Sequence, residues 1–220
     1  MSRPLPIPRL SPLLFALTLP LHTEIIDRIA ASVDRRVITQ SEVDRQIRVT
    51  AFQDGIKPDL GANHKQAVLQ TMIDQKLILR DLEDSHYPLP DPAELNPAIA
   101  EFKKDHFPSE AEYLRVLSQY GITDQDFRDL LLWQRTLLSF IEMRFAPTEP
   151  LTDREISDYF EKSVKPAAQA AHPGQPVTLD EYRDQIEKKL EAERSDRQLD
   201  AWLSGVRRRA QIVVHQGALQ

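Results

Sequence analysis

The sequence predicts a mainly α-helical fold with a small β-hairpin near the N-terminus and a short strand near the C-terminus. From Thr39 onward, helix start signals recur, and each is followed by apolar residues at helical spacing. Before Thr39, apolar and small side chains alternate over 29–33, as they do in a half-buried strand. A second short apolar run, 210–215, closes the chain as a strand candidate.

Composition limits the classes of function. The chain has 220 residues, 41% hydrophobic and 28% charged, which gives room for one large or two small domains with a core. Its net charge of −6 disfavours nucleic-acid binding, which usually needs a basic surface. The absence of cysteine removes disulfides, thiolate catalysis and cysteine-bound zinc.

Residues 1–24 have the pattern of a secretory signal peptide. Arg3 and Arg9 precede an apolar run over 13–21, which is too short to cross a bilayer as a helix of about 20 residues. Since no Ala-x-Ala cleavage pattern precedes Glu24, a disordered N-terminal tail is the alternative. We expect export, with the cleavage position open.

The first regular elements are a hairpin and a capped helix. Strand 29–33 and a return strand beginning at Val37 flank the polar turn 34–36. Thr39 stands three residues before Glu42, the spacing of a capping box, and predicts a helix over 40–53.

The middle of the chain is predicted to be helical throughout. Start signals are expected at Asp91-Pro92, Ser109/Glu112, Thr123/Asp126, Thr152/Glu155 and Thr178/Glu181. The predicted helices are 63–84, which begins at none of these signals, and 92–105, 110–120, 124–145 and 155–163; Thr178 precedes the last helix of the chain. Helix 124–145 is apolar nearly all round, which predicts a central buried helix.

The last third begins with a segment rich in alanine, glutamine, glycine and proline. This segment, 164–176, is predicted to be a linker. A single long helix over 179–209 follows, about 45 Å in length. Its middle, 191–198, is nearly all polar, so we expect it to bridge two packed ends.

Both ends of the chain resemble one protein family. The wording DRIAASVDRRVITQSEVDR within 25–49 is similar to the opening of the chaperone module of SurA-like periplasmic proteins, and RRRAQIVV at 207–214 is similar to their ending. The resemblance implies an N-terminal chaperone domain over 25–163. It also implies that 177–220 fold back onto this domain, with the last strand pairing with the hairpin.

The resemblance also concerns catalysis. Longer relatives carry parvulin-type prolyl isomerase domains between the short helix and the final helix, where this chain has only 164–176. The six histidines form no His-Glu-x-x-His pattern, and no Gly-x-Ser-x-Gly elbow is present. We therefore expect no enzyme activity, no metal and no cofactor.

A peptide-binding groove is the site that the sequence suggests. Aromatic residues and methionine provide large, adaptable contact surfaces. The candidates are Phe52, Tyr113, Leu117, Tyr120, Met143 and Phe145. Ordinary core packing is the alternative for each of them.

The resemblance implies an ATP-independent periplasmic holdase. Its expected partners are unfolded polypeptides rich in aromatic residues, outer-membrane protein precursors among them, with no nucleic acid and no stable membrane insertion after signal removal. Two alternatives stay open: a divergent peptidyl-prolyl isomerase, and an assembly module dedicated to one partner.

Overall fold

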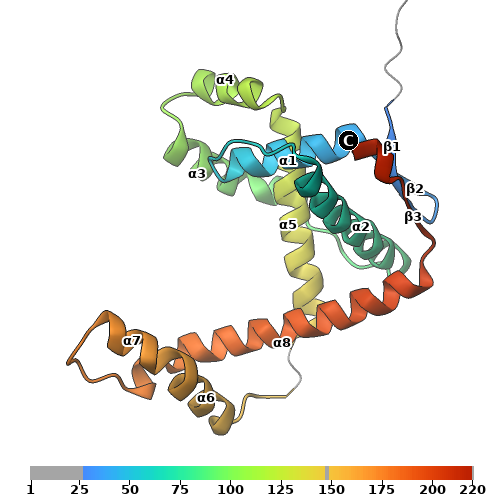
Figure 1. Cartoon of the computed structure of the whole chain (residues 1–220). Helices are drawn as coiled ribbons and strands as arrows, with labels where there is room; N and C mark the ends of the chain where they lie inside the picture. Colours follow the sequence, from blue (N-terminus) through green and yellow to red (C-terminus); the bar gives the residue numbers. More distant parts are fainter. Residues whose placement is uncertain (1–26, 147–148, 220) are drawn as a thin grey trace, which may run out of the picture.

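The computed structural model describes residues 27–146 and 149–219, and it is mainly helical (Figure 1). The predicted signal peptide therefore lies outside the described residues. Helix α5 (Asp124–Phe145) runs from the group formed by α1, α3 and α4 down to the long helix α8 (Leu179–Arg209). The β-sheet lies near one end of α8, and α6 and α7 lie near the other end.

The sheet joins the two ends of the described chain. Strands β1 (Ile29–Val33) and β2 (Arg36–Thr39) form the predicted hairpin. Strand β3 (Ile212–Val214) pairs antiparallel with β1, so the order is β2-β1-β3. In this register Ser32 lies opposite Val37 on one side and Val213 on the other. The pairing implied by the family resemblance is confirmed.

The hairpin turn is tied to both β3 and helix α2 (Ala62–Asp84) through Asp34. The Asp34 amide donates to the Gln211 carbonyl (2.8 Å), and the Gln211 amide donates back to Asp34 Oδ1 (2.9 Å). Arg80 of α2 forms an ion pair with the second carboxylate oxygen of Asp34. Asp34 has a φ of +53°, a left-handed conformation that aspartate tolerates better than most residues.

The main core lies beneath this sheet. Helix α2 packs Leu69, Ile73 and Leu77 against buried residues of both strands, α1 and the end of α8. Helix α1 (Gln40–Gln53) is further tied to α2 by Lys65, a nearly buried lysine whose Nζ lies 2.8 Å from Asp44 Oδ1. Since a buried charge without a partner is costly, this pair fixes the two helices side by side.

Most of the predicted helix starts are confirmed, because capping depends on residues close in sequence. Thr39, Thr123 and Thr152 each form a complete capping box. Asp91 caps a helical turn with Pro92 at its first position, although this turn, η1 (Pro92–Leu95), is a 3-10 helix that precedes α3 (Asn96–His106). Helix α8 also begins directly after Thr178, as predicted, but the expected capping box is wrong there, since the Thr178 side chain makes no capping hydrogen bond.

Helix α4 (Glu110–Tyr120) ends where predicted, at Gly121. Gly121 adopts a left-handed conformation with a φ of +68°. A Cβ there would lie 3.1 Å from the Arg48 guanidinium, which donates to the Tyr120 carbonyl. Glycine thus allows both the turn and this contact with α1.

Helix α5 has its predicted bounds, but the expectation of burial nearly all round is wrong. It buries Phe127, Leu130, Thr136, Phe140 and Phe145, whereas Leu138 is 48% exposed. The reason is geometric: α5 packs on α1 near its start and on α8 near its end, so many of its other apolar side chains are covered only in part.

Helix α8 packs at both ends, as predicted. Val206 belongs to the core beneath the sheet, and Ile186 belongs to a separate cluster with α6 (Asp153–Tyr159). The polar middle makes polar contacts instead: Arg194 donates to the Glu149 carbonyl, and Ser195 donates to the Phe145 carbonyl.

The segment expected as a linker contains a helix. After α6, the chain continues through a π-helical turn, η2 (Phe160–Val164), into α7 (Lys165–Ala171). The expectation of an unstructured linker is wrong for 165–171, because alanine has the highest helix propensity and four of these seven residues are alanine. The domain division at 164–176 stays a prediction.

The first prediction concerns the Asp34 tie. Asp34→Ala should lower the free energy of unfolding by about 2 kcal/mol, because it removes the Gln211 hydrogen bond and the Arg80 ion pair and places alanine at positive φ. Asp34→Asn keeps an acceptor and tolerates this φ, so it should lose less than half as much. Urea unfolding of the two variants measures the difference.

The same tie should depend on pH. The Gln211 amide, opposed by desolvation and aided by Arg80, holds the pKa of Asp34 below its ordinary value of 3.8. A lowered folded-state pKa stabilises the protein above the unfolded value, and this stability is lost as pH falls through the folded value. The gap in stability between the native protein and Asp34→Asn should therefore narrow between about pH 5 and pH 3. A constant gap would contradict this.

Candidate functional site

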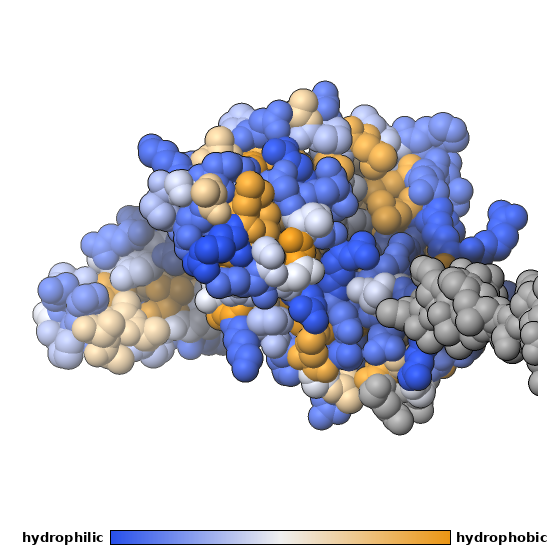
Figure 2. Space-filling model, turned by 90° about the horizontal axis from the view of Figure 1, so that it is seen from above, coloured by the Kyte–Doolittle hydropathy of each residue, from blue (hydrophilic) through white to orange (hydrophobic). Residues whose placement is uncertain are grey.

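An apolar hollow lies between α7 and the first half of α8. Its volume is about 500 Å³, in the range typical of binding sites. One wall is made of small side chains, Ala167, Ala168 and Ala171, and the facing wall includes Tyr182 and Ile186. Figure 2 shows a patch of apolar surface on the lobe that carries α6 and α7, at the left of the view.

Two features of the local sequence create this hollow. Alanines at positions 167, 168 and 171 fall on one face of α7 and leave space where larger residues would fill the gap. Ile156, Phe160 and Ile186 form the base of the lobe and hold η2 against α8. Sequence reasoning missed this site because the flanking prolines and glycine suggested a linker, although the alanine spacing was a signal for it.

Met143 lines a second, smaller hollow. It is 45% exposed and lies with Leu89, which is 59% exposed, around a space of about 290 Å³ bordered by Pro88 and Pro90. Two exposed apolar side chains beside a rigid proline segment form an adaptable contact surface. Of the six groove candidates, Met143 is the one on an open surface.

Three of the other candidates are core residues in this structure. Phe52, Tyr113 and Leu117 are 4%, 0% and 2% exposed and belong to one cluster between α1, α4 and α5. Tyr120 borders this cluster, half-buried, and its hydroxyl donates to the Ile56 carbonyl at 2.9 Å. These side chains therefore stabilise the fold and do not line an open groove.

The sixth candidate belongs to another part of the molecule. Phe145 is 7% exposed and packs against Phe140 and Trp202, where α5 meets α8. The six residues therefore do not form a single groove. Helical spacing identifies apolar positions but not which of them a distant segment covers, and α8 covers Phe145 from more than fifty positions away in sequence.

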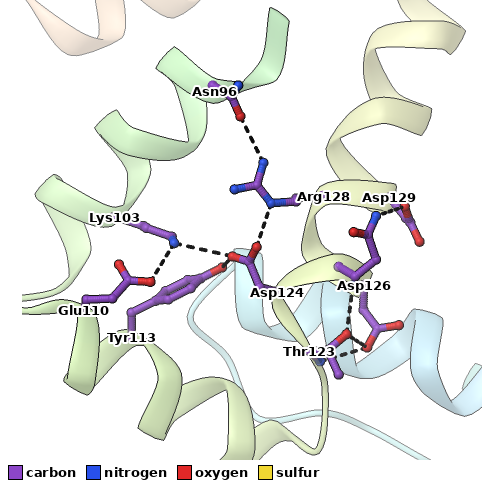
Figure 3. A network of polar contacts seen from close by, with 10 residues as sticks. Asn96, Lys103, Glu110, Tyr113, Thr123, Asp124, Asp126, Arg128 and Asp129 are labelled. Atoms are coloured by element: carbon purple, nitrogen blue, oxygen red, sulfur yellow. Dashed lines mark hydrogen bonds and ion pairs between the residues drawn. The ribbon is translucent and has the colours of Figure 1, made fainter. Parts of the chain in front are cut away.

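A network of polar groups joins α3, α4 and α5 around Asp124 (Figure 3). The buried Tyr113 hydroxyl donates to Asp124 Oδ1 (2.6 Å), and Arg128 Nε donates to Asp124 Oδ2 (2.6 Å). Lys103 Nζ lies 3.4 Å from Asp124, 2.9 Å from Glu110 and 4.0 Å from the centre of the Tyr113 ring. Arg128 also donates to Asn96 Oδ1 at 3.0 Å.

The environment shifts the pKa values of Tyr113 and Asp124 in opposite directions. Burial, and then the contact with Asp124, raise the pKa of the Tyr113 phenol far above its ordinary value. Burial alone would raise the pKa of Asp124, but the hydrogen bonds from Tyr113 and Arg128 and the charge of Lys103 outweigh it and lower that pKa. At neutral pH the Tyr113 hydroxyl is therefore protonated and donates to the Asp124 carboxylate, and this hydrogen bond links α4 to α5.

Metal binding and membrane crossing also depend on features that residues 27–146 and 149–219 would show. No group of three or more histidine, aspartate or glutamate side chains there could hold a metal ion. None of the helices in the same ranges is both long and apolar enough to cross a membrane.

The fold defines a helical module whose first hairpin is completed by its last strand. The model of the SurA-like N-terminal domain matches residues 21–139, more than half of the chain. The chain belongs to this family, which confirms the resemblance seen in its opening hairpin and first helix.

Curated relatives agree with the family. The chain is 26% identical over 169 residues to a protein named Chaperone SurA from Nitrosospira multiformis, and this covers 74% of the chain and 36% of the relative. It is 31% identical over 144 residues to Chaperone SurA from Xanthomonas campestris pv. campestris, over 62% of the chain and 31% of the relative. The matches thus cover about a third of the length of these relatives.

The second prediction separates core residues from surface residues. Tyr113→Ser should lower the free energy of unfolding by about 3–5 kcal/mol, because a fully buried ring is removed. Met143→Ser, at an exposed position, should change it by less than about 0.5 kcal/mol. Thermal and urea unfolding check both values, and a large loss for Met143→Ser would contradict its placement on the surface.

Proposed function

We propose that this protein is an ATP-independent holdase that binds segments of unfolded polypeptides. Its membership in the SurA-like N-terminal domain family carries the proposal, since its relatives are named as chaperones. A holdase makes and breaks no covalent bond in its client, so an exposed apolar surface is sufficient for this function. The function requires surfaces that accept many sequences.

The two hollows supply such surfaces. The space between α7 and α8 has a mainly apolar lining that a client side chain could enter, with Lys189 and His172 among its lining residues. The hollow at Met143 and Leu89 offers a second contact, on α5 and away from α7. Several weak apolar contacts along one client give affinity through multivalency without strict sequence selection.

The proposed place of action is the periplasm. The pattern of residues 1–24 supports export, and the family resemblance supports outer-membrane protein precursors as clients. Such precursors carry aromatic and aliphatic side chains at alternate positions and need to be kept from aggregating before they fold. A dedicated role for one partner is the alternative, and a test of several unrelated clients separates the two.

The third prediction tests the holdase function. At a molar ratio near one to one and without ATP, the protein should suppress the aggregation of an unfolded outer-membrane protein, measured by light scattering. Ala168→Glu places a hydrated carboxylate in the α7–α8 hollow and should weaken this protection, because an apolar client side chain that enters the hollow would have to desolvate it.

Ala170→Glu is the matched control. It makes the same substitution on the same helix at an exposed position outside the hollow, so it should leave protection unchanged. Equal loss in both variants would show that the hollow is not the client surface. Failure of the native protein to suppress aggregation would contradict the holdase function itself.

The fourth prediction concerns catalysis. We propose that binding does not include prolyl isomerisation, because the short segment 164–176 stands where longer relatives carry an isomerase domain. The protein should not accelerate cis–trans exchange of a proline-containing peptide above the rate with an inert protein. An acceleration that a point substitution in this chain removes would support the isomerase alternative instead.

A further inference from the structure

Six aromatic rings meet between α1, α3, α4 and α5. Phe52 lies at their centre, and its ring centroid is 5.3–6.0 Å from those of five others: Phe102, Phe107, Tyr113, Tyr120 and Phe127. Most of these pairs are tilted or edge-to-face, the arrangements that aromatic rings favour. An aromatic ring from another molecule that took the place of one of them could pack against the remaining rings in the same way.

Phe102 is the ring that α3 contributes. Its centroid lies 4.7 Å from that of Phe127, 5.9 Å from that of Phe52 and 6.0 Å from that of Phe107. Phe127 and Phe52 belong to α5 and α1, which are anchored elsewhere in the molecule. If α3 moved away, these rings would remain as a site from which one aromatic side chain is missing.

Helix α3 is held loosely. Of its eleven residues, it buries one, Ile99. A hollow of about 500 Å³ lies between its start and α5, lined in part by Leu95, Asn96 and Leu132. Elements with few buried apolar contacts open at a low free energy compared with the whole protein.

Ion pairs compensate for this weak packing. Lys103 links α3 to Glu110 of α4 and to Asp124 of α5, and Asn96 accepts a hydrogen bond from Arg128 (Figure 3). Lys103 is half-buried, and its ammonium also lies over the Tyr113 ring. These contacts hold the helix at both of its ends, near Asn96 and near Lys103.

We propose that α3 is a lid over a binding site for an aromatic side chain of an unfolded polypeptide, and that Phe102 occupies this site while the lid is closed. The inference rests on the proposed holdase function and adds the place where a client ring binds and the helix that controls access to it. Phe102 acts as an internal competitor. The apparent association constant for a client ring is then the intrinsic constant multiplied by the fraction of molecules whose lid is open.

Lys103→Met tests the lid, since it removes both ion pairs of Lys103 and keeps an apolar side chain. The probe is an unstructured Gly/Ser-rich peptide with two phenylalanines, and a second peptide with leucines in their place serves as its control. Removing the pairs should raise hydrogen exchange of the α3 amides and tighten binding of the phenylalanine peptide, each by about three- to ten-fold. Binding of the leucine peptide should change less.

Lys104→Met is the matched variant. It removes the same charge from the next residue, which is exposed, so exchange in α3 and peptide affinity should both stay at native values. Circular dichroism melting confirms that both variants are folded before binding is measured.

A closed lid provides the opposite test. The chain has no cysteine, so in Lys103→Cys/Glu110→Cys a short bismaleimide reacts only at the two introduced thiols. Before cross-linking this variant should bind the phenylalanine peptide more tightly than the native protein does, and after cross-linking more weakly. The same molecule thus serves as its own control for folding.

Three outcomes would overturn the lid. The first is unchanged hydrogen exchange of the α3 amides in Lys103→Met. The second is faster hydrogen exchange with no gain in affinity for the phenylalanine peptide. The third is an equal gain in affinity for the phenylalanine and leucine peptides. Each would leave the suppression of aggregation by the native protein untouched, so failure of the lid and failure of the holdase function are distinguishable.

Discussion

The pairing of β3 with β1 is the constraint on which the rest of the structure depends. Asp34 and Gln211, 177 positions apart, exchange two hydrogen bonds, and the Asp34 carboxylate reaches α2 through Arg80. Closing so long a loop costs conformational entropy, although the cost grows only slowly with length. Burial of Ala31, Val33 and Val206 beneath the closed sheet offsets it.

This closure sets the direction of α8 and thereby the arrangement of the binding surfaces. One end of α8 is fixed beside the sheet, so its other end extends away and carries α6 and α7 as a lobe of their own (Figure 1). Helix α5 meets α8 through Phe140, Phe145 and Trp202. A frame held at a few junctions leaves helix faces and hollows open between them, which suits a protein whose proposed task is to contact unfolded chains.

How far the sequence predicts this molecule depends on the range of each interaction. The hairpin, the capping boxes at Thr39 and Thr152, and the bounds of α4, α5 and α8 follow from residues a few positions apart, and they are predicted well. Thr178 shows the limit even of local rules, because its side chain makes no cap despite the correct spacing. The pairing of β3 was implied by resemblance and could not be obtained from periodicity.

The candidate site required knowledge of which segments meet. Phe52, Tyr113 and Met143 are equally good contact residues by type. The packing of α1, α4 and α5 against one another buries Phe52 and Tyr113, whereas Met143 stays exposed. The alanine wall of α7 becomes a surface only because Tyr182 and Ile186 of α8 face it. No pattern within a single segment contains that information.

The aromatic cluster shows why core and binding site need not be separate categories. Tyr113 and Phe127 are wholly buried, and Asp124 fixes Tyr113 by a hydrogen bond, so they belong to the permanent core. Phe102 packs against Phe127 and Phe52 but belongs to a helix with one buried residue. Stability requires that some ring fill the place beside Phe52 and Phe127, but not that it be the protein's own. A client ring that replaces Phe102 would restore most of the lost contacts, so exchange would cost far less than opening a core to water.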